Sequence, residues 1–182
     1  MELNICLVGC GMIGREHIER IQNRIRGAKV VAVCDVFEEG VKKGAEIAGP
    51  GTKTYTDFNE AINDPDVNAV VVTTPGQFHK DPVLAAIKAG KPVFCEKPLA
   101  NTAADCKAVV DAEMASGKHL VQIGFMRRYD RGYNQVKELL DSGKFGAPLI
   151  VKCTHRADGV APSYTTAMAV TDTAIHEIDC LP

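Results

Sequence analysis

Residues 5–14 read ICLVGCGMIG, and this stretch decides the fold. Its first four residues are apolar, which is typical of a strand covered on both faces, and Gly9, Gly11 and Gly14 follow at once. Helical spacing then predicts a helix over residues 12–25. In a strand-turn-helix setting the first glycine permits a tight turn, the second lets a pyrophosphate approach the backbone, and the third allows close helix–strand packing.

The start of that helix is predicted to hold a dinucleotide. Its free N–H groups, around Met12 and Ile13, and the positive end of its dipole favour phosphates. A second strand ends in Asp35, 21 residues past Gly14, where a carboxylate accepts hydrogen bonds from the adenosine ribose hydroxyls and repels a 2′-phosphate. No arginine follows Asp35, so NAD is favoured over NADP. The alternative is a glycine turn and a solvated aspartate without a cofactor.

Strands and helices alternate over the first two-thirds of the chain. This order predicts right-handed βαβ crossovers and an α/β, doubly wound parallel sheet of the Rossmann type. The strands are expected at 4–9, 29–35, 53–55, 69–73, 92–96 and 119–123, and the helices at 12–25, 37–48, 58–62, 78–89 and 102–116.

The character of the sequence changes after Gly124. A polar stretch is followed by an expected helix at 134–140, a strand at 149–155, a loop at 157–166 and a helix at 172–181. We therefore expect a dinucleotide-binding domain at 1–124 and the incomplete start of an α+β substrate domain at 125–182.

Composition excludes several classes of protein. The chain has 182 residues, 46% of them apolar and 24% charged, with a net charge of −2, which argues against disorder and against a nucleic-acid partner. No run of about 18 apolar residues predicts a membrane span, and the N-terminus lacks the features of a signal peptide. Seven cysteines without a C-x-x-C pair indicate reduced core residues in a cytoplasmic protein, and we assign no metal site.

Two further strand ends carry polar groups. Thr73, Thr74 and Pro75 end one strand, where their hydroxyls and rigid turn are expected to line the cofactor. His79 lies on the next helix, either near the cofactor or as a packing residue. Residues 96–98 read EKP, and the proline disfavours a helical Lys97, so its ammonium is expected to project into the cleft, where it favours a developing alkoxide. A surface lysine in a turn is the alternative.

Together these motifs resemble the glucose–fructose oxidoreductase/inositol dehydrogenase/rhizopine catabolism (Gfo/Idh/MocA) family. The resemblance is carried by the glycine turn, Asp35, Thr74-Pro75 with His79, and above all the EKP tripeptide with Glu96 and Lys97. It continues through residues 124–130, 155–156, 164–166 and 172–179, and the later segments are most similar to the inositol dehydrogenases within the family.

Asp172, His176 and Asp179 are spaced four and three residues apart. On an α-helix the second and third lie at about +40° and −20° from the first, so all three share one face. An imidazole beside carboxylates is a good proton acceptor. The alternative is that Asp172 caps the helix and His176 is a packing histidine.

The resemblance implies reversible oxidation of a secondary alcohol on a polyol, such as myo-inositol, with NAD. It makes His176 the proton acceptor oriented by Asp172, gives Lys97 a hydrogen bond to the same hydroxyl, and places Arg127 and His155 at the polyol. Glu96 and Lys97 are expected in the cofactor set, and Asp179 as a supporting carboxylate.

Two features depart from the family pattern. Ala157 and Ala167 stand where polar residues are common, so glucose or scyllo-inositol stays open as the substrate. Family members also continue into an antiparallel sheet that floors the substrate site and makes oligomer contacts. We therefore expect an incomplete substrate domain, and a module that binds NAD without turnover is the second hypothesis.

Overall fold

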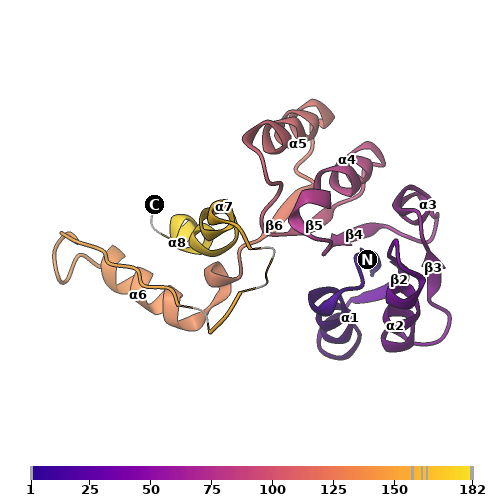
Figure 1. The fold of residues 1–182 in the computed structure, drawn as a ribbon, viewed down its shortest axis with the longest axis horizontal. Helices are drawn as coiled ribbons and strands as arrows, with labels where there is room; N and C mark the ends of the chain where they lie inside the picture. Colours follow the sequence, from indigo (N-terminus) through magenta and orange to yellow (C-terminus); the bar gives the residue numbers. More distant parts are fainter. Residues whose placement is uncertain (1, 157, 161, 163, 181–182) are drawn as a thin grey trace. The chain divides into compact units, whose positions relative to one another are not determined.

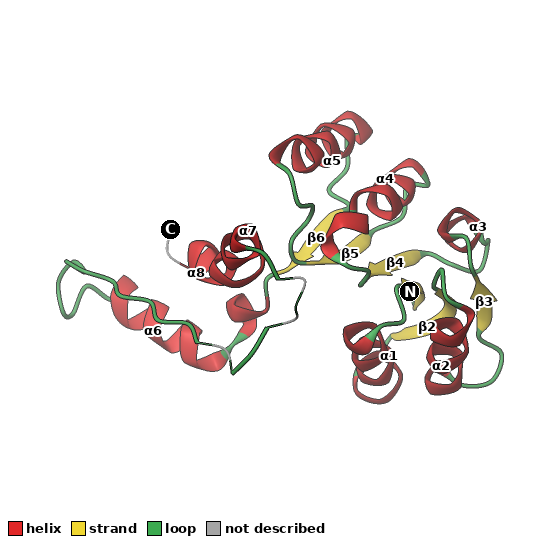
Figure 2. Cartoon of the chain, viewed as in Figure 1, coloured by secondary structure: helices red, strands yellow, loops and turns green. Residues whose placement is uncertain are grey.

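The architecture is that of a computed structural model, which describes residues 2–156, 158–160, 162 and 164–180. The chain divides into two compact units, Met1–Gly124 and Phe125–Pro182. Figure 1 follows the chain through both units, and Figure 2 separates helix from strand.

The first unit is built on one parallel sheet of six strands in the order β3-β2-β1-β4-β5-β6. The chain runs outward from β1 to β3, returns to the centre at β4, and runs outward again to β6. The order of strands therefore reverses between β1 and β4, which is where ligands bind in such sheets. The strands are β1 (Leu3–Val8), β2 (Ala28–Cys34), β3 (Lys53–Tyr55), β4 (Ala69–Val72), β5 (Val93–Glu96) and β6 (Val121–Gly124).

Helices cover both faces of this sheet (Figure 2). Alternate residues of β1 point to opposite faces, so Ile5 and Leu7 pack with α1 and α2, whereas Cys6 and Val8 pack with α3, α4 and α5. Both sets are buried, which explains the continuous apolar runs of the strands. The helices are α1 (Met12–Arg24), α2 (Glu38–Ala48), α3 (Phe58–Asn63), α4 (Lys80–Lys88) and α5 (Ala103–Ser116), with a 3-10 turn η1 (Gly76–Phe78) before α4.

The edge strand β3 is held by a buried carboxylate. Asp64 accepts hydrogen bonds from the Lys53 ammonium at 2.7 Å and from the Tyr55 hydroxyl, and its side chain is 7% exposed. The hydrogen bonds from Lys53 and Tyr55 outweigh burial and lower the pKa of Asp64 to about 2. The contribution of this network to the stability of the sheet edge therefore depends on pH, because it requires an ionised Asp64.

The second unit is mostly helical where it is described. It contains η2 (Met126–Tyr129), α6 (Arg131–Asp141), α7 (Thr166–Met168), the π-helical η3 (Ala169–Ala174) and α8 (Ile175–Cys180). The expected strand at 149–155 is wrong, because those residues pair with no other strand and a single strand leaves its backbone groups without partners. Within the described ranges, no helix is long and apolar enough to cross a bilayer.

Sequence reasoning also misjudged the last helix. It predicted one α-helix over 172–181, whereas the chain is π-helical up to Ala174 and α-helical only from Ile175, with Leu181 outside the described residues. A π-helix has a wider turn, so the α-helical angle used to place Asp172 on the face of His176 does not apply there.

Candidate functional site

The glycine turn joins β1 to α1 and has the shape expected from its sequence. Gly9 has a φ of 101°, and a Cβ atom there would lie 2.5 Å from the Thr74 amide nitrogen. A Cβ at Gly14 would lie 2.0 Å from the Gly9 carbonyl oxygen. Among the residues that the structure describes, none has an atom within 4 Å of a Cβ added at Gly11, so a ligand can approach the backbone here.

The start of α1 is suited to an anion. Gly11 is its N-cap residue and offers no side-chain hydrogen bond to the first turn. The leading N–H groups of a helix lack intrahelical partners and carry the positive end of its dipole. They therefore fit the pyrophosphate of a dinucleotide.

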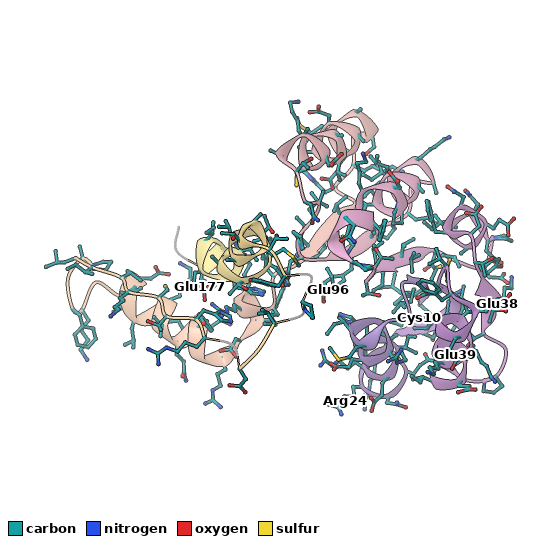
Figure 3. All side chains as sticks on the ribbon, in the orientation of Figure 1. Cys10, Arg24, Glu38, Glu39, Glu96 and Glu177 are labelled. Atoms are coloured by element: carbon teal, nitrogen blue, oxygen red, sulfur yellow. The ribbon has the colours of Figure 1, made fainter. Side chains whose placement is uncertain are left out.

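Asp35 lies directly after β2 and is fixed against the glycine turn. Its Oδ2 accepts a hydrogen bond from the Cys10 amide at 2.7 Å, and its Oδ1 accepts one from the Phe37 amide at 3.0 Å. Figure 3 labels Cys10, which belongs to this turn. A carboxylate has about four acceptor sites, so capacity remains for two ribose hydroxyls. No basic residue follows at Val36 or Phe37 to pair with a 2′-phosphate.

A cavity of about 570 Å³ lies over these groups. Its lining includes Gly9, Gly11, Met12, Ile13, Cys34, Asp35, Val36, Phe37, Thr73, Thr74, Pro75 and Phe78. A second hollow of about 790 Å³ lies between α2 and β3, and carboxylates at Glu38, Glu46 and Glu60 line it. The smaller cavity is the one that fits a dinucleotide, because the glycine turn and the start of α1 line it, whereas the lining of the larger hollow contains no residue of that turn.

Two threonines directly after β4, Thr73 and Thr74, lie next to the glycine turn. The Thr73 hydroxyl donates to the Gly9 carbonyl oxygen at 2.7 Å and is buried. Thr73 therefore holds the glycine turn in addition to lining the cavity. The Thr74 Oγ1 atom is buried and has no hydrogen-bond partner among the residues that the structure describes. A buried polar atom of this kind is suited to a ligand or a water molecule.

His79 is buried and does not line the cavity. Its Nε2 lies 2.6 Å from the Thr74 carbonyl oxygen and its Nδ1 lies 2.6 Å from the Pro98 carbonyl oxygen. The side chain is 1% exposed, so both ring nitrogens face the backbone. The expected contact of His79 with the cofactor therefore stays a prediction, and the packing alternative gains support.

Glu96 and Lys97 end β5. The Glu96 Oε1 lies 2.8 Å from Nε2 of His17, a residue of α1 that the sequence reasoning missed (Figure 3 labels Glu96). Burial by itself would raise the pKa of Glu96, but the hydrogen bond and charge of His17 hold that pKa below its usual value. Lys97 is partly exposed, and its peptide bond to Pro98 is cis.

In the second unit one carboxylate joins two of the predicted substrate residues. The Arg127 guanidinium donates to Oε1 of Glu177, and the His155 Nδ1 lies 3.6 Å from the same oxygen. The Arg127 guanidinium also lies 4.9 Å from the centre of the Tyr133 ring. Figure 3 labels Glu177 on α8. Sequence reasoning missed Glu177, although its place directly after His176 was a usable signal.

The remaining predicted residues of this unit lie around the π-helical turn. Asp172 is in η3, and His176 is buried at the start of α8. Asp179 binds the Arg128 side chain through both carboxylate oxygens, at 2.6 and 2.9 Å. Ala157 lies outside the described residues.

The fold and the turn define the first unit as a Rossmann-type dinucleotide-binding domain. A family model described as "Oxidoreductase family, NAD-binding Rossmann fold" matches residues 3–125, and the chain belongs to this family. This result confirms the family and the fold class that the sequence predicted.

Curated relatives and solved structures show what the chain resembles more closely. It is 54% identical over 181 residues to inositol 2-dehydrogenase of Azotobacter vinelandii. The matched region covers 100% of this chain and 54% of the relative. Myo-inositol dehydrogenase from Lactobacillus casei, solved with NAD(H) and myo-inositol, matches with a TM-score of 0.93 and 43% identity, over 99% of this chain and 53% of that one. Scyllo-inositol dehydrogenase from the same organism matches with a TM-score of 0.75 and 30% identity, over 80% and 43%. The chain thus spans about half the length of the curated relatives it matches.

Proposed function

We propose that the chain binds NAD and serves the oxidation of a secondary alcohol on a cyclic polyol, with myo-inositol as substrate and its 2-keto derivative as product. The observation that carries this proposal is the cavity bounded by the glycine turn and by Asp35, whose carboxylate is already fixed by two backbone N–H groups. The similarity to an inositol dehydrogenase bound to NAD(H) and myo-inositol supports the substrate.

In this proposal the cofactor is held by backbone and by one carboxylate. The N–H groups at Gly11, Met12 and Ile13 bind the pyrophosphate, and Asp35 accepts from the ribose hydroxyls. Thr73, Thr74 and Pro75 bound the cavity near the end of β4. NAD, when bound, supplies the acceptor for the hydride that leaves the alcohol carbon.

The chain's own residues handle the proton. Lys97 donates a hydrogen bond to the reacting hydroxyl and lowers the cost of its developing negative charge. A ring nitrogen of His176 accepts the hydroxyl proton, and the Asp172 carboxylate stabilises the imidazolium that results. Arg127 and His155 bind other hydroxyls of the polyol, in an arrangement that Glu177 supports.

Other substrates, and a function other than catalysis, are the alternatives to this proposal. The match to a scyllo-inositol dehydrogenase favours a different polyol, and glucose is a third candidate substrate. A module that binds NAD without turnover is the alternative to an enzyme. The seven cysteines are all free, which supports a reducing compartment such as the cytoplasm. Self-association of the chain stays a prediction from the family resemblance.

Appearance of NADH on mixing the chain, NAD and myo-inositol at alkaline pH tests the proposal. Turnover is expected to disappear in Lys97→Ala and His176→Ala while calorimetric NAD binding persists. A fully active Lys97→Ala variant would end the mechanism. NAD binding without turnover in the wild-type chain favours the binding module, and faster turnover of scyllo-inositol or glucose changes the substrate but keeps the class.

A further inference from the structure

The tripeptide Glu96-Lys97-Pro98 is held on both sides of the lysine by a histidine. On one side, Nε2 of His17 lies 2.8 Å from the Glu96 carboxylate. On the other side, Nδ1 of His79 lies 2.6 Å from the Pro98 carbonyl oxygen. The two histidines come from different parts of the first unit, because His17 lies in α1 and His79 directly precedes α4.

His79 connects two turns that line the ends of neighbouring strands. Its Nε2 faces the Thr74 carbonyl oxygen, so the ring bridges the turn after β4 and the turn after β5. These turns also pack directly, because a Cβ at Gly76 would lie 3.0 Å from Cγ of Pro98. A carbonyl oxygen only accepts hydrogen bonds, so the contact with Pro98 is a hydrogen bond when Nδ1 carries a proton, and the contact with Thr74 is one when Nε2 carries a proton.

His17 contacts the Glu96 carboxylate through Nε2, whereas His79 contacts Pro98 through Nδ1. Its ring stands edge-on to Phe94, with centroids 5.6 Å apart and planes at 62°. Phe94 in turn packs against the end of β6, since a Cβ at Gly124 would lie 2.7 Å from its Cζ atom. This packing limits the ring of His17 to a position from which Nε2–H reaches Glu96.

We propose that His17 and His79 are positioning residues for Lys97, acting through the side chain of Glu96 and the carbonyl of Pro98. This inference rests on the proposed function for its assumption that Lys97 contacts the reacting hydroxyl. A lysine ammonium sits on a flexible four-carbon stem. Fixing the residues on both sides of Lys97 sets the direction in which that stem leaves the backbone, and small errors in such placement are costly for rate.

Proton location on His79 tests the proposal without any activity. Nitrogen-15 spectroscopy of the imidazoles in the free 182-residue chain is expected to show a proton on Nδ1 of His79 and on Nε2 of His17. A bare lone pair at Nδ1 of His79 would overturn the proposal, because the contact with Pro98 would then not be a hydrogen bond. This result is independent of whether the chain turns over a polyol.

Amide substitutions give a reciprocal pattern that a general loss of stability does not produce. The side-chain amide of asparagine imitates Nδ1–H of histidine, and that of glutamine imitates Nε2–H. At position 79 we expect His79→Asn to retain kcat within about threefold and His79→Gln to lose about tenfold. At position 17 the order reverses, with His17→Gln retained and His17→Asn reduced.

The remaining readouts separate positioning from binding and from folding. The KM for polyol and the Kd for NAD are expected to change by less than about twofold in all four variants. His119→Ala, at an exposed histidine of the same unit, is the control and should match the wild type. Equal losses for both amides at each position would overturn the proposal. Absence of turnover in the wild-type chain would count against the proposed function, and the proton on Nδ1 would still decide this inference.

Discussion

Two glycines of the same turn should respond in opposite ways to the same added methyl group. At Gly14 the new Cβ would lie 2.0 Å from the Gly9 carbonyl oxygen and 2.8 Å from the Thr73 Oγ1 atom. Alanine gains about 1 kcal/mol over glycine within a helix. Overpacking costs about 1–3 kcal/mol, and loss of the hydrogen bond from Thr73 to Gly9 costs about 1 kcal/mol more. We expect Gly14→Ala to lower the free energy of unfolding by about 2 kcal/mol.

At Gly11 the same methyl group meets no atom of the described part of the chain within 4 Å, and the φ of −66° suits alanine. The lower preference of alanine for an N-cap and its smaller unfolded-state entropy nearly cancel, so stability should change by less than about 0.5 kcal/mol. If the pyrophosphate lies against this backbone, however, the methyl group occupies its place. We expect Gly11→Ala to weaken NAD binding at least about tenfold, or about 1.4 kcal/mol.

Thermal unfolding and calorimetric titration with NAD measure the two effects separately. Gly14→Ala should lower the Tm by about 8 °C, and Gly11→Ala should leave it within about 2 °C. Gly27→Ala is a poor control because its φ is 82°. At Gly159 an added Cβ would meet no atom of the described residues within 4 Å. Gly159→Ala should therefore change neither quantity. Wild-type NAD affinity in Gly11→Ala would refute the assignment of phosphates to this turn.

Three further changes have expected outcomes. Asp35→Asn keeps the shape of the side chain but removes the charge that repels a 2′-phosphate. The preference for NAD over NADP, measured by calorimetry as the ratio of the two Kd values, should therefore fall at least about tenfold. An unchanged ratio of Kd values would contradict the role of Asp35. The pKa of Asp64 lies at about 2, below its ordinary 3.8, so the stability that its contact with Lys53 contributes is complete above about pH 4 and is lost as the pH falls toward 2. In denaturant unfolding, Asp64→Asn should cost about 1 kcal/mol at pH 7 and only a small fraction of that near pH 2. An undiminished difference in acid would exclude this network as the cause. Glu177→Gln removes the negative charge that accepts the hydrogen bond of the Arg127 guanidinium. The KM for polyol should therefore rise about tenfold while the Kd for NAD stays the same. A change confined to NAD binding would show that Glu177 acts elsewhere.

The first unit could be predicted well from the sequence because its signals are local and agree with one another. Apolar runs, glycines and helical spacing each point to the same order of elements, and the six strands begin and end within two residues of their expected bounds. The turn at residues 9–14 combines a strand, a tight turn and a helix start, so its geometry follows from steric rules.

The second unit could be predicted less well, because its structure depends on contacts that no local pattern contains. Residues 149–155 have the composition of a strand but pair with no other strand, and composition does not reveal whether a partner exists. The π-helix at Ala169–Ala174 leaves no signature in hydrophobic spacing.

The side-chain partners of the site show the same division. Asp35 could be placed from its position after a strand, since the carboxyl ends of parallel strands meet at one edge. The pairs His17–Glu96 and Arg127–Glu177 are separated by 79 and 50 residues, so no spacing rule brings them together. His79 was predicted to contact the cofactor or to pack, and its burial between two carbonyl oxygens favours the packing alternative.

The most direct test of a dinucleotide at this sheet is to follow the backbone amide signals of the chain by NMR during a titration with NAD. We predict that the largest shift changes fall on Gly9–Gly14, on Asp35–Phe37 and on Thr73–Thr74. Shift changes centred on the acidic hollow between α2 and β3, or none at millimolar NAD, would contradict the account.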